Sequence, residues 1–333
     1  MNVNYVVSLL AVIVLALIAL IGSALPGGQG LFGIFIPYVA VLIFICFFCY
    51  RIIDWARRPV PFRITSTCGQ QKTLSWIAHD RFENPTKAWE VVVRMVLEIC
   101  CFRSLFRNTK ASLKEGGKLT YSLEKWLWLG SIAFHYAFLT VLIRHFRFFL
   151  EPVPVWLKLL ESLDGFLQVG LPGVLMSGFV LLAGVTFLFL RRLFIPQVRY
   201  ISLASDYFPL FLIFGIAASG LLMRYVTKID VVSAKELTMG LVTLHPVIPA
   251  AGVGSIFYVH IFLVSVLLAY FPFSKLMHVG GIFLSPTRNM TGNSRAVRHV
   301  NPWNYPVHVH TYEEYEDEFR ERMIEAGLPV EKE

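Results

Sequence analysis

Charged residues are scarce in this chain of 333 residues, in which Asp, Glu, Lys and Arg make up only 16% of the sequence. Soluble globular domains are nearer ~25% charged. Hydrophobic residues make up 56% of the chain, and several long runs contain no charged residue at all. This deficit of charge argues against a soluble globular protein and favours a protein that lies largely within a membrane.

Sequence signatures of several other protein classes are also missing. The sequence contains no Gly-rich phosphate loop, no nucleotide motif, no internal repeat and no low-complexity tract. The net charge of +8 is distributed between apolar segments, so it does not indicate a nucleic-acid partner. The odd number of five cysteines argues against a disulfide framework, and their spacing does not match a four-thiolate cluster.

What the sequence does contain is six runs without Asp, Glu, Lys or Arg that are long enough to cross a membrane. About 20 apolar residues, each rising ~1.5 Å along a helix, span a ~30 Å hydrocarbon core. The first run lacks the basic residues that precede a signal peptide, so we expect it to be retained. We predict an all-α, polytopic membrane protein whose six transmembrane helices form a dihaem cytochrome b bundle, with spans at 5–24, 31–50, 126–143, 165–190, 207–223 and 251–274.

Two parts of different character are expected, a transmembrane domain at 1–275 that includes a long loop at 51–125, and a soluble tail at 276–333. The loop holds 14 basic and 7 acidic residues, whereas the connections on the opposite side hold only six basic residues in total. Lys and Arg accumulate on the cytoplasmic side of membrane proteins. We therefore predict a multi-pass protein of the cell inner (cytoplasmic) membrane, with the loop, the tail and both termini in the cytoplasm.

The segment 86–108 within the loop has the pattern of an amphipathic helix. Such a helix is typical of a position at the level of the lipid headgroups, or of a docking site for a partner. A helix that covers its own bundle explains the pattern equally well. The charged face carries Lys87, Glu90, Arg94 and Glu98, and the apolar face carries Trp89, Val92, Val93, Val96 and Ile99.

Two pairs of histidines accompany the apolar runs. His135 and His145 lie in and at the end of the third run, and His260 and His278 lie in and just beyond the sixth. A histidine in lipid is costly unless a partner offsets the cost, and haem iron binds neutral imidazole at its axial positions. Since the third and sixth helices run in opposite directions, we expect His135 to face His278, and His145 to face His260, across two haems b.

The spacing supports these four ligands unevenly. In a continuous helix, eighteen residues bring His260 and His278 to the same face, whereas ten residues leave His135 and His145 about 80° apart. The corresponding rises of ~27 Å and ~15 Å differ, so helix tilt or an irregular chain near Pro272 is required. His278 is the ligand that the spacing supports least, and the alternative ligand is a histidine of the preceding loop, His245.

Other polar side chains near the outer histidines are candidates for binding cofactor and substrate. Arg144 and Arg147 would bind haem propionates by charge-assisted hydrogen bonds, although arginines at a membrane interface need no haem to explain them. Lys235, Glu236 and His245 would line a quinol site, where a base accepts the protons that a quinol releases. An ordered loop with solvated charges is the alternative explanation for these three residues.

A transporter that relays protons through histidines is the main alternative to a cytochrome. Transporters usually add buried Asp or Glu to such a relay. The six predicted membrane cores contain neither residue, so we favour a membrane cytochrome b.

Several motifs resemble those of a known family. The histidine pairs, ten and eighteen residues apart, resemble those of the gamma subunit of respiratory nitrate reductase, a family that binds two haems b and oxidises quinol. Over nearly the whole chain, the sequence also resembles the DsrM family, the cytochrome b subunits of the DsrMKJOP membrane complex of dissimilatory sulfite reduction. That second resemblance lies in residues 67–72, 102–110, 194–200, 285–290 and 299–304.

The resemblance implies a function and a set of partners. His135, His145, His260 and His278 match the haem ligands of gamma subunits. The chain would be the menaquinol-oxidising subunit of a membrane oxidoreductase complex in dissimilatory sulfate or sulfite reduction, with electrons passing through two haems b to a cytoplasmic, DsrK-like iron–sulfur subunit. Further membrane and periplasmic redox subunits are implied, and the small protein DsrC is the indirect acceptor. The alternative is a gamma-type cytochrome b that serves another reductase.

Overall fold

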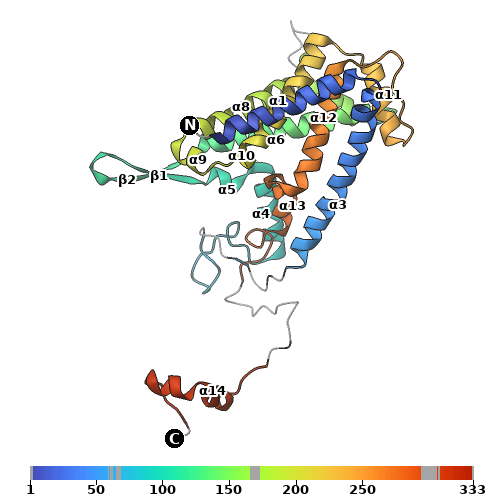
Figure 1. Cartoon of the computed structure of the whole chain (residues 1–333). Helices are drawn as coiled ribbons and strands as arrows, with labels where there is room; N and C mark the ends of the chain where they lie inside the picture. The colour runs from blue at the N-terminus through green and yellow to red at the C-terminus, as the bar shows by residue number, and fades with distance from the viewer. Residues whose placement is uncertain are drawn as a thin grey trace.

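The computed structural model describes residues 3–58, 60, 63–64, 69–165, 173–293, 306 and 308–331. Within these residues, six helices are long and apolar enough to cross a membrane (Figure 1). They are Val3–Ala24, Gly28–Ala56, Lys125–Phe148, Met176–Phe194, Ala204–Thr227 and Ser255–Phe273. The prediction of an all-α, polytopic membrane protein is confirmed, because each charge-free run of the sequence overlaps one of these helices.

Three of the six spans end in a short π-helical or 3-10 turn, and the second span has a π-helical turn near its start. The α-helical parts of the spans are α1 (Val3–Ala24), α3 (Ile36–Ala56), α6 (Lys125–His145), α8 (Met176–Phe194), α10 (Ala204–Leu221) and α12 (Ser255–Tyr270). The shorter helices are α2 (Gly28–Gly30), α4 (Ala88–Cys101), α5 (Arg103–Phe106), α7 (Val155–Asp164), α9 (Pro196–Ile201), α11 (Val231–Val242), α13 (His278–Gly281) and α14 (Tyr312–Glu325). The π-helical turns are Leu31–Phe35 and Leu222–Thr227, and the 3-10 turns are Glu115–Gly117, Phe146–Phe148, Phe271–Phe273, Lys275–Met277 and Ile282–Leu284.

The spans pack as a bundle in which α10 is central. Helix α10 contacts α1, α8 and α12, while α6 packs on α8, and α3 packs on α12. Figure 1 shows α3 and α12 side by side and inclined to α1. One buried apolar cluster includes Leu212, Leu237 and Leu263, and a second includes Leu181 and Val185. Many large apolar side chains of the spans remain exposed, which suits a surface that faces lipid.

A glycine allows the closest approach of α6 and α8. A Cβ atom added at Gly184 would lie 3.1 Å from the Cα atom of Phe134. Small residues let helix backbones approach each other closely in membranes, where van der Waals contact is a main source of helix association. The α6–α8 contact therefore depends on the missing side chain at this position.

The fourth span begins later than the charge-free run 165–190 indicated. Helix α7 ends at Asp164, and α8 begins at Met176. The carboxylate of Asp164 accepts hydrogen bonds from the backbone N–H of Ser177, at 2.8 Å, and from its hydroxyl, at 2.6 Å. A carboxylate that binds the free N–H groups of a first helical turn stabilises the helix start, so Asp164 sets this boundary. Residues 166–172 lie outside the described part of the chain.

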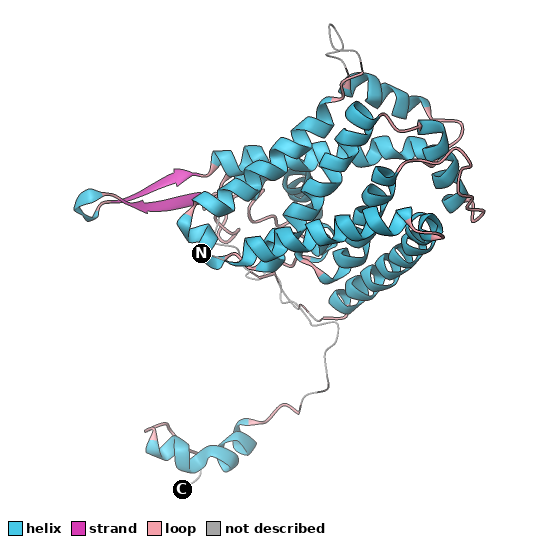
Figure 2. Ribbon diagram, turned by 45° about the horizontal axis from the view of Figure 1, so that its top comes forward, coloured by secondary structure: helices cyan, strands magenta, loops and turns pink. Residues whose placement is uncertain are grey.

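The predicted loop at 51–125 contains a β-hairpin that the sequence analysis missed. Strand β1 (Thr109–Leu113) pairs with β2 (Leu119–Leu123) in antiparallel register, and Gly116 and Gly117 make the turn with positive φ angles. Figure 2 shows the hairpin projecting from the bundle. The predicted helix at 86–108 is interrupted, because Phe102 adopts a left-handed conformation with φ 50° between α4 and α5.

Part of the predicted tail lies on the bundle. The backbone N–H of Gly292 donates to the carbonyl of Pro85 at 2.5 Å, and a Cβ atom added at Gly281 would lie 3.3 Å from the ring of Trp55. Helix α14 is drawn apart from the bundle in Figures 1 and 2. The motif segments 67–68 and 299–304 of the resemblance lie outside the described residues.

Candidate functional site

The structure brings the four histidines together as two pairs. The ring centroids of His145 and His260 are 6.2 Å apart, and those of His135 and His278 are 6.0 Å apart. These are the two pairs that the antiparallel helices led us to expect. Two imidazoles that bind one iron from opposite sides have centroids about 6.3 Å apart when each metal–nitrogen bond is ~2.0 Å long. Both spacings therefore fit an iron between the rings.

The Nδ1 atom of each histidine has a hydrogen-bond partner. In three of them the partner is a backbone carbonyl of the same chain segment: Ser131 for His135 at 2.7 Å, Val141 for His145 at 2.6 Å, and Lys275 for His278 at 2.9 Å. Among the described residues, no hydrogen bond involves the Nε2 atom of any of the four rings. An imidazole whose Nδ1–H is held by a carbonyl presents the lone pair of Nε2 to a metal, so these three rings have the tautomer that ligation needs.

His260 differs from the other three because its Nδ1 partner lies on another helix. The Oγ atom of Ser219, on α10, lies 2.9 Å from His260 Nδ1 and also donates a hydrogen bond to the carbonyl of Ile216 at 3.0 Å. The hydroxyl therefore accepts the Nδ1–H of His260. A Cβ atom added at the next residue, Gly220, would lie 3.4 Å from His260 Cε1. The sequence analysis missed Ser219, because no local pattern links residues 41 positions apart.

The chain between His260 and His278 is not a continuous helix, so the argument that placed both on one face by counting turns is wrong. Helix α12 ends at Tyr270, and Ser274 is extended, with φ −114° and ψ 175°. The Oγ atom of Ser274 accepts the N–H of Leu276 at 3.1 Å and starts a new turn. This break removes the mismatch between the axial rises, since His278 reaches His135 from a separate helix, α13.

Helices α6 and α12 face each other through side chains. Within the described residues they are not among the closely packed helix pairs, whereas α6 packs on α8 and α12 packs on α3. Cofactor sites in helix bundles are built from side chains of facing helices. The contact of His145 with His260 across this separation is the arrangement that a planar cofactor between two helices requires.

Arg144 and Arg147 are engaged by the neighbouring helix α7. Arg144 Nη1 lies 2.6 Å from Asp164 Oδ2 and 2.8 Å from Ser177 Oγ. Arg147 Nη1 lies 2.8 Å from Glu161 Oε1. The Nε atom of Arg144 is buried and has no hydrogen-bond partner among the described residues, so Arg144 keeps a donor for a propionate.

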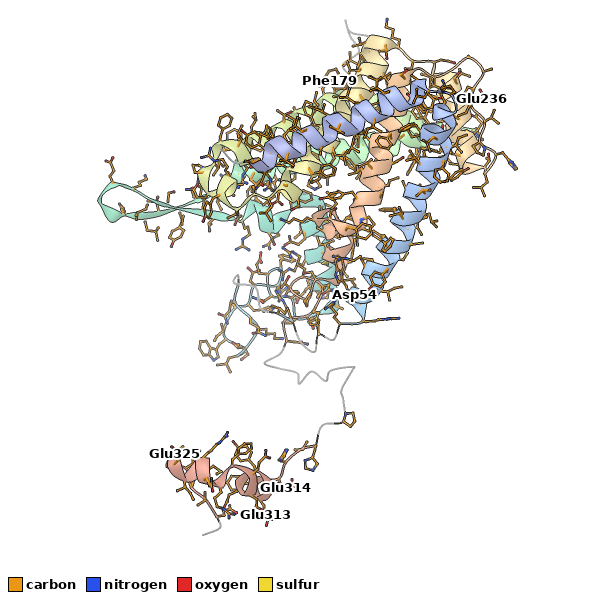
Figure 3. All side chains as sticks on the ribbon, viewed as in Figure 1. Asp54, Phe179, Glu236, Glu313, Glu314 and Glu325 are labelled. Atoms are coloured by element: carbon orange, nitrogen blue, oxygen red, sulfur yellow. The ribbon has the colours of Figure 1, made fainter. Side chains whose placement is uncertain are left out.

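Two of the three predicted quinol residues line one shallow pocket. Lys235 and Glu236 share it with Glu151, Val231, Val232 and Met239, and its volume is about 340 Å³. The ammonium of Lys235 binds the carboxylate of Glu151, a residue that the sequence analysis missed. Figure 3 places Glu236 at the end of the bundle opposite Asp54.

The pocket lies next to the end of α6 that carries His145. Thr238, on the same helix as Lys235, donates a hydrogen bond from Oγ1 to the carbonyl of Phe148 at 2.8 Å. The rings of Phe148 and His145 are 6.0 Å apart. By contrast, His245 is exposed beyond the end of α11 and does not line the pocket.

Comparison with known proteins supplies independent evidence. The family described as "Nitrate reductase gamma subunit" matches residues 86–299, a range that includes all four histidines. A protein of Archaeoglobus fulgidus is 49% identical over 280 residues, covering 82% of this chain and 83% of the relative. A protein of Archaeoglobus profundus is 41% identical over 275 residues, covering 81% of each chain. Both relatives are named "Hdr-like menaquinol oxidoreductase cytochrome b-like subunit".

Proposed function

Because the chain belongs to the nitrate reductase gamma subunit family, we propose that it is the cytochrome b subunit of a membrane complex that oxidises menaquinol. The observation that carries this proposal is the pair of ring distances, 6.2 Å for His145 with His260 and 6.0 Å for His135 with His278. The names of the two Archaeoglobus relatives support menaquinol as the substrate.

We assign the four histidines as the axial ligands of two haems b. The carbonyl and hydroxyl partners of Nδ1 hold each ring in one orientation and one tautomer, and the buried Nε of Arg144 is the donor for a propionate at the outer pair. When bound, the two haems supply one-electron carriers at two depths of the membrane, which the two-electron oxidation of a quinol needs.

The quinol site that we propose is the pocket on α11. Oxidation of a quinol to a quinone releases two protons and two electrons, and the carboxylates of Glu151 and Glu236 are two acceptors for the protons. Lys235 holds Glu151 in place through its ion pair. We therefore keep Lys235 and Glu236 in the site, add Glu151, and leave the exposed His245 outside it.

The end of the bundle that carries His135 and His278 is proposed to face the cytoplasm. The predominance of Lys and Arg in the loop 51–125 supports this orientation in the cytoplasmic membrane, with both termini inside. On the resemblance to the DsrM family, the partner at this end is a DsrK-like iron–sulfur subunit, with further membrane and periplasmic redox subunits in the complex. DsrC is then the indirect acceptor of the electrons.

An absorption spectrum and a haem assay of the purified full-length chain test the proposal. We expect a b-type Soret band and two haems per chain. The double substitution His145→Ala with His260→Ala should leave one haem, and the control His245→Ala should leave both. A wild-type protein that stays colourless after reconstitution with haem would refute the assignment.

A further inference from the structure

Helix α4 has its charged face inside and its apolar face outside. The buried side chains are Glu90, Arg94 and Glu98, which are 2%, 2% and 5% exposed. The exposed side chains are Trp89, Val92, Val96 and Ile99, at 50%, 62%, 53% and 37%. Helix α4 thus covers part of the protein with its charged face, which is the reverse of an amphipathic helix on a soluble protein.

The buried face of α4 is paired with charged and polar groups of the same chain, although the Nε atom of Arg94 has no hydrogen-bond partner among the described residues. The guanidinium of Arg94 donates to the carbonyl of Glu83, whose carboxylate also binds Arg103 and Arg107. Burial lowers the pKa of Arg94, and the nearby carboxylate of Glu83 opposes this effect. Buried charges are tolerated only when they are paired and hydrogen-bonded, and Glu83 supplies that pairing.

Glu98, one turn further along α4, is satisfied in the same way. Its carboxylate accepts hydrogen bonds from the hydroxyl and the N–H of Ser104, and it lies 3.8 Å from Arg288 Nε. Ser104 follows α4 in the chain, whereas Arg288 belongs to the segment after α13. The charged face of α4 is therefore in contact with the segment that follows α4 and with the segment that follows α13.

The end of α4 is attached to a membrane span. The carbonyls of Cys100 and Cys101 accept hydrogen bonds from Tyr136 Oη and Trp128 Nε1, each at 2.8 Å. The last carbonyls of a helix have no partner within it, so here side chains of α6 replace water. Since α6 crosses from Lys125 to Phe148, both donors lie in its first half.

We propose that α4 lies within the leaflet that surrounds the N-terminal half of α6, with its apolar face on lipid acyl chains. In hydrocarbon, backbone polar groups must be satisfied by the protein itself, and amphipathic helices place their apolar face ~5–10 Å into the boundary of the acyl chains. The hydrogen-bonded carboxylates of α4, the bonded carbonyls of Cys100 and Cys101, and the exposed apolar side chains Leu129 and Leu139 of α6 support this position.

This position gives α4 a role at the inner histidine pair. The ring of Phe102, directly after α4, lies 5.0 Å from the ring of His135. The end of α4 therefore adjoins the inner histidine pair through Phe102.

Accessibility of a nitroxide spin label tests the proposal in liposomes that contain the full-length chain. The label is placed at Val92→Cys in a background whose native cysteines are replaced by Ala. Matched controls are a label at Cys46, retained as the one native cysteine in its variant and exposed on the span α3, and a label at Trp76→Cys, where the native side chain is 78% exposed in a loop. Oxygen dissolves in lipid, whereas a nickel chelate stays in water, so the two collision rates identify the surroundings of each label.

We expect the label at Val92→Cys to resemble the label at Cys46, with high oxygen accessibility. Its collision rate with the nickel chelate should be at least about fivefold below that of the label at Trp76→Cys, since polar solutes enter hydrocarbon poorly. High nickel accessibility would overturn the proposal. So would low accessibility to both reagents in the assembled complex, because it would show that a protein partner covers this face.

A second measurement keeps the proposal testable if the cysteine background does not fold. Brominated lipids should quench the fluorescence of the wild-type protein more than that of Trp89→Phe, because Trp89 is 50% exposed on the apolar face. Equal quenching of the two proteins would overturn the proposal. Neither readout depends on haem or on menaquinol oxidation, so the result is independent of the proposed function.

Discussion

The imidazole rings of His145 and His260 lie 6.2 Å apart with their planes at 11°. His145 takes its Nδ1 partner from its own helix, whereas His260 takes it from Ser219 on α10. The outer histidine pair thus depends on three spans, and we expect a change in any of them to be visible in the proposed outer haem.

The inner ligand can be identified by substitution of two histidines. We expect His278→Ala to reduce the haem content from two to one per chain, because the ring of His278 is the one that faces His135 at 6.0 Å. His245→Ala should leave both haems, since His245 is exposed beyond α11. A pyridine haemochrome assay of the purified variants measures the ratio. Loss of a haem only in His245→Ala would contradict the assignment of His278.

Ser219→Ala should weaken the outer site without unfolding the bundle. The substitution leaves the Nδ1–H of His260 without its acceptor, and loss of such a partner typically costs ~10–100-fold in metal affinity. Haem titration and the midpoint potential of the outer haem measure the effect. The matched control is Ser265→Ala, because among the described residues the buried hydroxyl of Ser265 bonds only to the carbonyl of Ile261 on its own helix. Equal behaviour of the two variants would argue against a positioning role for Ser219.

Glu83→Ala should destabilise the protein strongly. The Glu83 side chain is 4% exposed and pairs with three arginines, and removal of one partner from a buried ion pair costs about 3–5 kcal/mol. Thermal unfolding in detergent measures the change. Asp54→Asn is the control, since the Asp54 pair with Arg58 lies on an exposed turn and should contribute nothing measurable. A wild-type melting temperature for Glu83→Ala would show that water reaches the cluster.

Glu236→Gln should slow menaquinol oxidation while leaving the haem spectrum unchanged. Removal of a general base typically costs ~10²–10⁴-fold in rate, and Glu236 lines the pocket beside Lys235 and Glu151. Stopped-flow reduction of the haems by a menaquinol analogue measures the rate. We expect Glu151→Gln to be slow as well, and His245→Ala to reduce its haems at the wild-type rate. If His245→Ala were slow and both glutamate variants reduced their haems at the wild-type rate, the quinol site would lie in the loop after α11.

The start of α4 should loosen at acid pH. Burial by itself raises the pKa of Glu90, but hydrogen bonds from Thr86 and from the N–H of Lys87 outweigh it and hold the pKa below its ordinary value. Ionised Glu90 therefore stabilises α4 above ~pH 4.3, and this contribution is lost as the pH falls through the folded-state pKa. The difference in fluorescence between wild type and Trp89→Phe should change in that range. In the Glu90→Gln background the same transition should be absent.

The runs without charged residues were enough to predict the six spans. The length of such a run can be read directly from the sequence and compared with the thickness of the hydrocarbon core. The antiparallel order of the spans was also enough to predict which histidines face each other. The break at Ser274 was not predictable from the turn count, since Pro272 marks an irregularity but not the direction in which the chain continues. The hairpin at Thr109–Leu123 was not predicted, because its two strands are short and exposed and no apolar run marks them.

The sequence by itself determined that the described part of this chain has six helices long and apolar enough to cross a membrane, and which histidines face each other as pairs. Only the tertiary structure decided that Ser219 meets His260, that Glu151 joins the pocket of Glu236, and that α4 turns its charges inward. The reason is physical: periodicity shows that a helix has two faces, but which face is buried depends on whether water, lipid or protein surrounds it. That choice is made by contacts between residues far apart in the chain.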